Sequence, residues 1–122
     1  MKMDDYSDLY EPSPEELGLQ SYCFVVAQLL SELHPNCRFF RITNMDKFDH
    51  VVIEKSGVYI DIRGKHTKEQ LLNFDEWKGM ELIETSIEEI MEYFMGFTEQ
   101  VVFDIVKERL LEYIDNRREN YT

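Results

Sequence analysis

The segment from Gln20 to Leu33 constrains the fold most, because apolar side chains would surround most of a helix formed there. Its apolar residues recur three and four positions apart, as they do on the buried side of a helix. His34-Pro35-Asn36 ends the segment, since proline cannot continue the hydrogen-bond ladder of a helix. We therefore predict a central, mostly buried helix. Its apolar positions are Cys23, Phe24, Val25, Val26, Ala27, Leu29, Leu30 and Leu33.

The middle of the chain predicts a small antiparallel sheet. Residues 37–43 and 48–55 are rich in aromatic and β-branched residues, which favour strands, and residues 44–47 form a turn between them. Ser56-Gly57 is a two-residue turn signal, and residues 58–63 alternate between apolar and polar side chains. The stretch around Ser56-Gly57 is therefore expected to be a β-hairpin, and residues 81–85 add a further short strand.

Helices are expected before, between and after the predicted strands along the sequence. Ser13 is a cap for a short helix that begins at Pro14 and ends at Gly18. Thr67 and Ser86 begin capping boxes, which predict helices over residues 68–73 and 87–95. A long amphipathic helix starts at Thr98, with its apolar side toward the core. We assign to that side Val101, Val102, Ile105, Val106, Leu110, Tyr113 and Ile114. We also assign to the core Met91, Tyr93, Phe94, Met95 and Phe97, although the same residue types make adaptable partner surfaces when they are exposed.

The length and composition fit one domain of α+β class. A chain of 122 residues with 43% hydrophobic residues can build a core without metal or disulfide support. We expect a small antiparallel sheet, a buried central helix and C-terminal helices. Residues 1–13 are polar and acidic and are expected to be a flexible arm, while residues 14–122 form the single domain.

The charge of the chain excludes several classes of partner. Thirteen Lys and Arg against twenty-five Asp and Glu give a net charge of −12, which repels nucleic-acid backbones and anionic membranes. No apolar run reaches the roughly 20 residues of a membrane span, and no secretory signal is visible, so we expect a cytoplasmic protein. Cys23 and Cys37 lack CxxC spacing and are expected to be free thiols.

The hairpin places two candidate functional residues together. A two-residue turn at Ser56-Gly57 pairs Lys55 with Val58, so that His50 and Asp61 become diagonal neighbours on one face. A carboxylate that accepts one imidazole N–H fixes the histidine tautomer and stabilises its charged form. Cys23, near the start of the central helix, is the candidate thiol, because the positive end of a helix stabilises a thiolate.

Three segments carry a resemblance to a known family. They are Ser21-Tyr22-Cys23-Phe24-Val25-Val26-Ala27, His50-Val51-Val52-Ile53 and Val58-Tyr59-Ile60-Asp61-Ile62-Arg63-Gly64. Over about residues 20–64 the chain resembles the papain-like group of cysteine enzymes with Cys, His and Asp in chain order, which includes transglutaminase-like and peptidase-like domains. The resemblance implies a papain-like minimal core that acts on amide or acyl bonds, with Cys23 as nucleophile, His50 as general base and Asp61 as orienting acid.

Structural explanations of the same residues stay open. A cysteine on the apolar side of a helix is commonly a small core residue. The second face of the hairpin, with His50 and Asp61, could equally be the solvent face of an ordinary sheet. The spacings among Cys23, Cys37, His34, His50 and His66 match no structural zinc motif, so we expect no metal, and no cofactor motif is present.

Two functions are therefore predicted from the sequence. The first is a cysteine hydrolase or acyl transferase of papain-like type acting on a peptide or other amide substrate, or an inactive relative of such an enzyme. The alternative is a non-enzymatic acidic module or inhibitor that covers a basic surface on a nucleic-acid-handling protein partner, because complementary charge speeds encounter. The basic partner is expected to dock where six glutamates give the second half of the chain much of its negative charge: Glu81, Glu84, Glu88, Glu89, Glu92 and Glu99.

Overall fold

A five-stranded antiparallel sheet is the centre of the fold in the computed structural model, which describes residues 13–44 and 49–122, the side chains of Gln20 and Ser21 excepted. The strand order is β4-β3-β2-β1-β5. The expected α+β class with an antiparallel sheet is confirmed. The strands are β1 (Arg38–Thr43), β2 (His50–Lys55), β3 (Val58–Asp61), β4 (Gly64–His66) and β5 (Glu81–Thr85).

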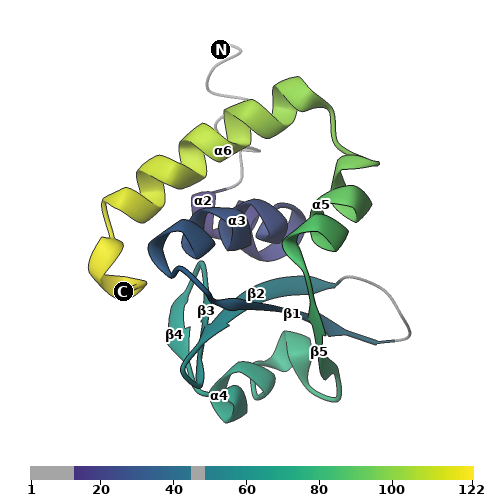
Figure 1. The fold of residues 1–122 in the computed structure, drawn as a ribbon, viewed down its shortest axis with the longest axis vertical. Helices are drawn as coiled ribbons and strands as arrows, with labels where there is room; N and C mark the ends of the chain where they lie inside the picture. Colours follow the sequence, from purple (N-terminus) through teal and green to yellow (C-terminus); the bar gives the residue numbers. More distant parts are fainter. Residues whose placement is uncertain (1–12, 45–48) are drawn as a thin grey trace, which may run out of the picture.

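Helices cover both faces of this sheet (Figure 1). The central helix α3 packs on β2 and β3, α6 lies across α3 on its outer side, and α4 lies against the opposite face of the sheet. The helices are α2 (Pro14–Glu16), a π-helical turn (Leu17–Ser21), α3 (Cys23–Leu33), α4 (Lys68–Leu72), a 3-10 turn (Asp75–Trp77), α5 (Ile87–Met95), α6 (Gln100–Asp115) and a 3-10 turn (Arg118–Asn120). Within the described ranges, none of them is long and apolar enough to cross a bilayer.

The start of the central helix differs from the prediction. Ser13 caps α2, as expected, and also forms a full capping box with Glu16, but Gly18 does not end the helical path. The chain continues through Gly18 as a π-helical turn, breaks at Tyr22 and begins α3 at Cys23 rather than at Gln20. A Cβ on Gly18 would lie 2.9 Å from the side chain of Ile62, so this glycine permits close packing instead of terminating a helix.

The hairpin forms with the predicted register, and the structure adds a strand after it. Ser56 and Gly57 both have positive φ, and Lys55 pairs with Val58. Such a two-residue turn matches the twist of the strands that it joins. The sequence analysis treated residues 64–66 as a linker, but they form β4, in which Gly64 pairs with Asp61. The predicted arm, apart from Ser13, and residues 45–47 of the predicted turn lie outside the described residues.

Two apolar clusters lie on opposite faces of the sheet. The larger is formed by α3, α5, α6 and the inward side of the strands, and it includes Cys23. The smaller lies under α4 and the 3-10 turn. It contains Phe40, Ile42, Val52, Leu71 and Trp77. The sequence left open that the second face of the hairpin is exposed to solvent. In the structure, Leu71 and Trp77 pack against this face and cover it at that point.

The buried side of α6 is also partly different from the prediction. Phe103, which was not assigned to that side, is buried and stacks near Phe24 of α3 at 6.2 Å between ring centroids. Val101 and Ile105 were expected in the core but are 60% and 57% exposed. Because α6 rests on α3 through Phe103, the residues two positions before and after it point away from the core.

Candidate functional site

A buried carboxylate, Asp61, lies at the centre of the candidate site. It is the last residue of β3 and only 1% exposed. Nε2 of His50 donates to Oδ2 at 3.1 Å, Nε2 of His66 donates to Oδ1 at 3.0 Å, and the backbone N–H of Arg63 donates to Oδ1 at 2.8 Å. Burial alone would raise the pKa of Asp61, but the hydrogen bonds and charges of the two histidines hold it below its ordinary value. Asp61 is therefore a buried anion.

His50, the first residue of β2, is the main partner of this anion. Its side chain is fully buried and stacks on the indole of Trp77, with ring centroids 4.6 Å apart and planes within 10°. Burial alone would lower the pKa of His50, but hydrogen bonding to Asp61 and Cys23, with the charges of both, raises it from 6.5 to about 9. His50 is therefore an imidazolium at neutral pH, held against the face of an aromatic ring.

Cys23 approaches His50 from the other side of the sheet. It is the first residue of α3, belongs to the larger apolar cluster and is 2% exposed. Its thiol is near enough to raise the pKa of His50, although Nδ1 of His50 has no hydrogen bond of normal geometry among the described residues. Since Nε2 is occupied by Asp61, Nδ1 is the ring nitrogen available to the thiol. The three predicted residues are thus brought together, and all three are buried.

Two buried polar atoms at this site lack a hydrogen-bond partner among the described residues. They are Nδ1 of His50 and the indole Nε1 of Trp77, on two rings in direct contact. An unpaired buried donor or acceptor costs about 1–3 kcal/mol, and such atoms in a native fold call for an explanation. A site that bonds a further group during function is one such explanation. No role for Trp77 was predicted, because its packing onto His50 depends on tertiary structure.

His66 is the residue of this constellation that the sequence analysis missed as a partner of Asp61. It lies in β4 opposite Tyr59, which puts it on the same face as Asp61. A sequence signal existed, because Gly64 with positive φ allows a second tight turn, and its register pairs residues 59 and 66. The analysis considered His66 only as a metal ligand. Within the described part of the chain, no three His, Cys, Asp or Glu side chains are grouped to hold a metal ion.

Surface cavities reach the edge of the site but not its centre. A cavity of about 390 Å³ is lined by Lys65, His66, Gln70, Asn73 and Phe74, and a neighbouring one shares Lys65, His66 and Gln70. Neither has Cys23 or His50 in its lining. His66 lines both cavities and donates a hydrogen bond to Asp61, so its side chain connects the protein surface to this carboxylate.

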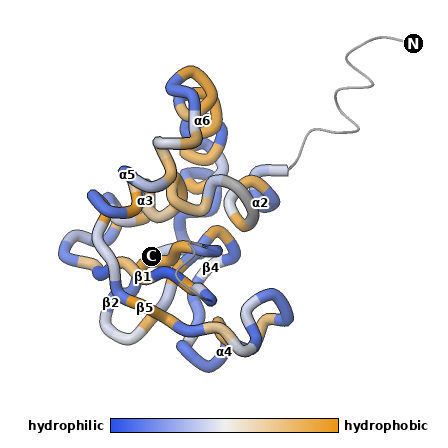
Figure 2. Tube along the Cα trace, turned by 90° about the vertical axis from the view of Figure 1, so that its right-hand side faces the viewer, coloured by the Kyte–Doolittle hydropathy of each residue, from blue (hydrophilic) through white to orange (hydrophobic). Residues whose placement is uncertain are grey.

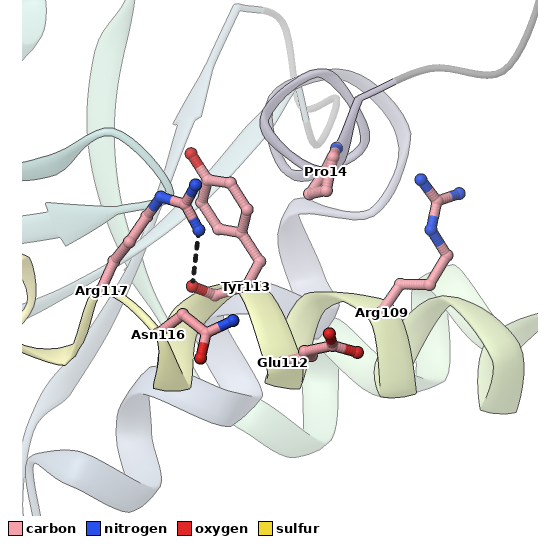
Figure 3. Close-up of a pocket in the computed structure, with 6 residues that line it drawn as sticks. All are labelled: Pro14, Arg109, Glu112, Tyr113, Asn116 and Arg117. Atoms are coloured by element: carbon pink, nitrogen blue, oxygen red, sulfur yellow. Dashed lines mark hydrogen bonds between the residues drawn. The ribbon is translucent and has the colours of Figure 1, made fainter. Parts of the chain in front are cut away.

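A separate pocket lies between α2 and the end of α6 (Figure 3). It has a volume of about 250 Å³, and Pro14 faces Arg109 and Tyr113 across it. The guanidinium of Arg117 donates to the backbone carbonyl of Tyr113 at 3.3 Å and lies over its ring. The pocket shares no lining residue with the Cys23-His50-Asp61 site, so we do not connect the two.

Comparisons with models of protein families, with curated proteins and with solved structures found no match for this chain.

Proposed function

We propose that this protein is a papain-like cysteine hydrolase or acyl transferase that acts on amide-type bonds through Cys23, His50 and Asp61. The observation that carries the proposal is the buried hydrogen bond between Nε2 of His50 and Asp61, which leaves Nδ1 of a ring whose pKa the nearby Cys23 thiol raises. A buried imidazolium beside a thiol favours the thiolate, which is the nucleophilic form of cysteine.

Each residue has a defined task in the proposed reaction. The Cys23 thiolate attacks the carbonyl carbon of the substrate, and the imidazolium of His50 then gives its Nδ1 proton to the leaving amine. This step breaks the amide bond and leaves an acyl group on sulfur. Neutral His50 next takes a proton from water or from an acceptor amine, whose attack releases the acyl group and restores the thiolate. Asp61 keeps the His50 ring oriented throughout.

Selective alkylation tests the proposal, and Cys37 serves as the internal control. Cys37 is more exposed than Cys23, and burial raises the pKa of its thiol. We expect iodoacetamide at about pH 7 to modify Cys23 faster than Cys37, because the proposal makes Cys23 the nucleophile that His50 activates. The site of modification is read by peptide mass mapping. A His50→Gln variant should lose this preference, whereas a Cys37→Ser variant should keep it.

One set of labelling results would contradict a catalytic role for Cys23. If Cys37 reacts first, and if Cys23 reacts only after unfolding at a rate that His50→Gln does not change, Cys23 is a core residue and the proposal fails. A panel of aryl ester and anilide substrates, with Cys23→Ala as the matched control, then separates an enzyme from an inactive relative with a retained thiolate. Turnover that persists in Cys23→Ala would contradict a role for this thiol.

The acidic binding module remains the alternative proposal. Its predicted acidic surface lies on β5, on α5 and at the start of α6, elements that do not include His50 or Asp61, so the two functions do not compete for the same residues.

A further inference from the structure

Helices α5 and α6 leave a line of large apolar side chains uncovered. The part of the chain that the structure describes has six exposed large hydrophobic residues, and five of them lie between residues 93 and 111. Phe97 is 81% exposed, the highest value among them. Most isolated exposed apolar residues need no explanation, but a contiguous group on a small domain marks an interaction site.

Four of these side chains follow one another along the chain from α5 into α6. The rings of Tyr93 and Phe97 contact each other, with centroids 5.5 Å apart, and connect the end of α5 to the start of α6. Val101 and Ile105 follow at four-residue steps, which places them on the same side of α6. We call Tyr93, Phe97, Val101 and Ile105 the apolar strip. Figure 2 shows α6 as the outermost helix, with hydrophobic residues on the part of its coil turned away from α3.

Acidic residues outnumber basic residues on the segment that carries the apolar strip. Between residues 86 and 115 the chain carries eight acids and two bases, a net charge of −6, which is half of the net −12 of the whole chain. One of the two bases, Lys107, is turned toward the ring of Phe103 on the side of α6 that packs on α3. All eight acids of this segment are exposed, namely Glu88, Glu89, Glu92, Glu99, Asp104, Glu108, Glu112 and Asp115.

The apolar strip and the acidic residues near it together determine which kind of partner can bind there. A second copy of the chain would bring two surfaces of the same strong negative charge together, which is unfavourable. A partner must instead offer apolar side chains at helical spacing and Lys or Arg on the flanks, because the strip follows a helix axis and its rim is acidic. We propose that the apolar strip of α5 and α6 binds a basic amphipathic helix of another protein. This binding does not depend on whether Cys23 is catalytic.

A designed peptide probes this surface on the full-length chain. The probe is a fluorescently labelled Leu/Lys peptide of about 18 residues, or five helical turns, with leucines repeated at helical spacing. A peptide of equal composition with dispersed leucines is the control for charge alone. We expect fluorescence anisotropy to show binding of the first peptide at least about tenfold tighter than binding of the second. Raising NaCl from about 0.05 to 0.5 M should weaken both.

Matched variants locate the site. Val101→Ser together with Ile105→Ser removes apolar surface without changing charge and should weaken binding of the first peptide by about tenfold or more. Val58→Ser is the control, because Val58 is an exposed residue on β3, away from the strip. Phe97→Ser provides an independent test, since Phe97 lies between the helices and outside α6.

Three results would overturn the proposal. The first is equal affinity for the two peptides, which would reduce the interaction to charge alone. The second is unchanged binding by the Val101→Ser/Ile105→Ser variant and by Phe97→Ser. The third is a dimer of the free protein in sedimentation that the same substitutions dissociate, since the strip would then be occupied by a second copy.

Discussion

Raising the pH from about 6 to 9 should destabilise this protein through one residue, His50. The unfolded chain releases the His50 proton near 6.5, whereas the folded protein keeps it until about 9. Between these values the native state binds one more proton than the unfolded state, so the free energy of unfolding falls as the pH rises. A difference of about 2.5 pKa units, at about 1.4 kcal/mol each, corresponds to a loss of roughly 3 kcal/mol.

Urea unfolding followed by circular dichroism measures this loss directly. The stabilisation should be complete below about pH 6.5 and absent above about pH 9. Protonated imidazole also quenches indole fluorescence, and Trp77, the single tryptophan of the chain, stacks on His50. The emission of the folded protein should therefore increase with a midpoint near 9, which reports the His50 pKa without unfolding.

Two variants show whether the effect belongs to the His50 and Asp61 pair. Asp61→Asn removes the charge that stabilises the imidazolium, so the slope of stability against pH between about 6.5 and 9 should disappear. Because loss of one partner of a buried pair can cost about 3–5 kcal/mol, His50→Gln serves as a second variant if Asp61→Asn does not fold. Cys37→Ser should retain the slope. A wild-type stability that is flat over this range, or a fluorescence midpoint below about 7, would refute the argument.

Three further substitutions test other parts of the structure. His66→Gln should lower the free energy of unfolding by about 1–3 kcal/mol, because Asp61 loses one of its buried donors; an unchanged urea midpoint would show that this hydrogen bond is unimportant. Tyr121→Phe should cost about 1–3 kcal/mol, since the buried hydroxyl donates to the carbonyl of Ile62 at 2.7 Å, and equal Tm values for the two proteins would contradict that role. Gly18→Ala should destabilise by about 1–3 kcal/mol by crowding Ile62, whereas Gly96→Ala, at a helix end with more room, should be near neutral in the same thermal unfolding assay.

Much of the candidate site was predictable because it depends on local strand geometry. Ser56-Gly57 sets a two-residue turn, the turn sets the register, and the register puts His50 and Asp61 on one face. The position of His66 follows from a second tight turn before Gly64, which sets the register of β4 in the same way. However, residues 64–66 are too short to be recognised as a strand from their composition. His66 therefore needed the structure to be paired with Asp61.

The helices show where sequence patterns reach their limit. The apolar side of α6 is wider than the area that packs against α3. Periodicity alone therefore could not show that Val106 and Leu110 lie in the core while Val101 and Ile105 lie on the surface. The packing of Phe103 near Phe24 decided the rotation of the helix. The same rotation exposed Val101 and Ile105, the part of the apolar strip on α6, which had been assigned to the core.

The amino-acid sequence by itself determined the class of the fold, the buried central helix, the hairpin register and the contact between His50 and Asp61, since each follows from short-range backbone preferences and side-chain periodicity. Only the tertiary structure decided that Trp77 covers His50, that the thiol of Cys23 comes next to the same ring, and that the pair is fully buried. These properties depend on segments distant in sequence packing together, and burial is what sets the charge state of the site.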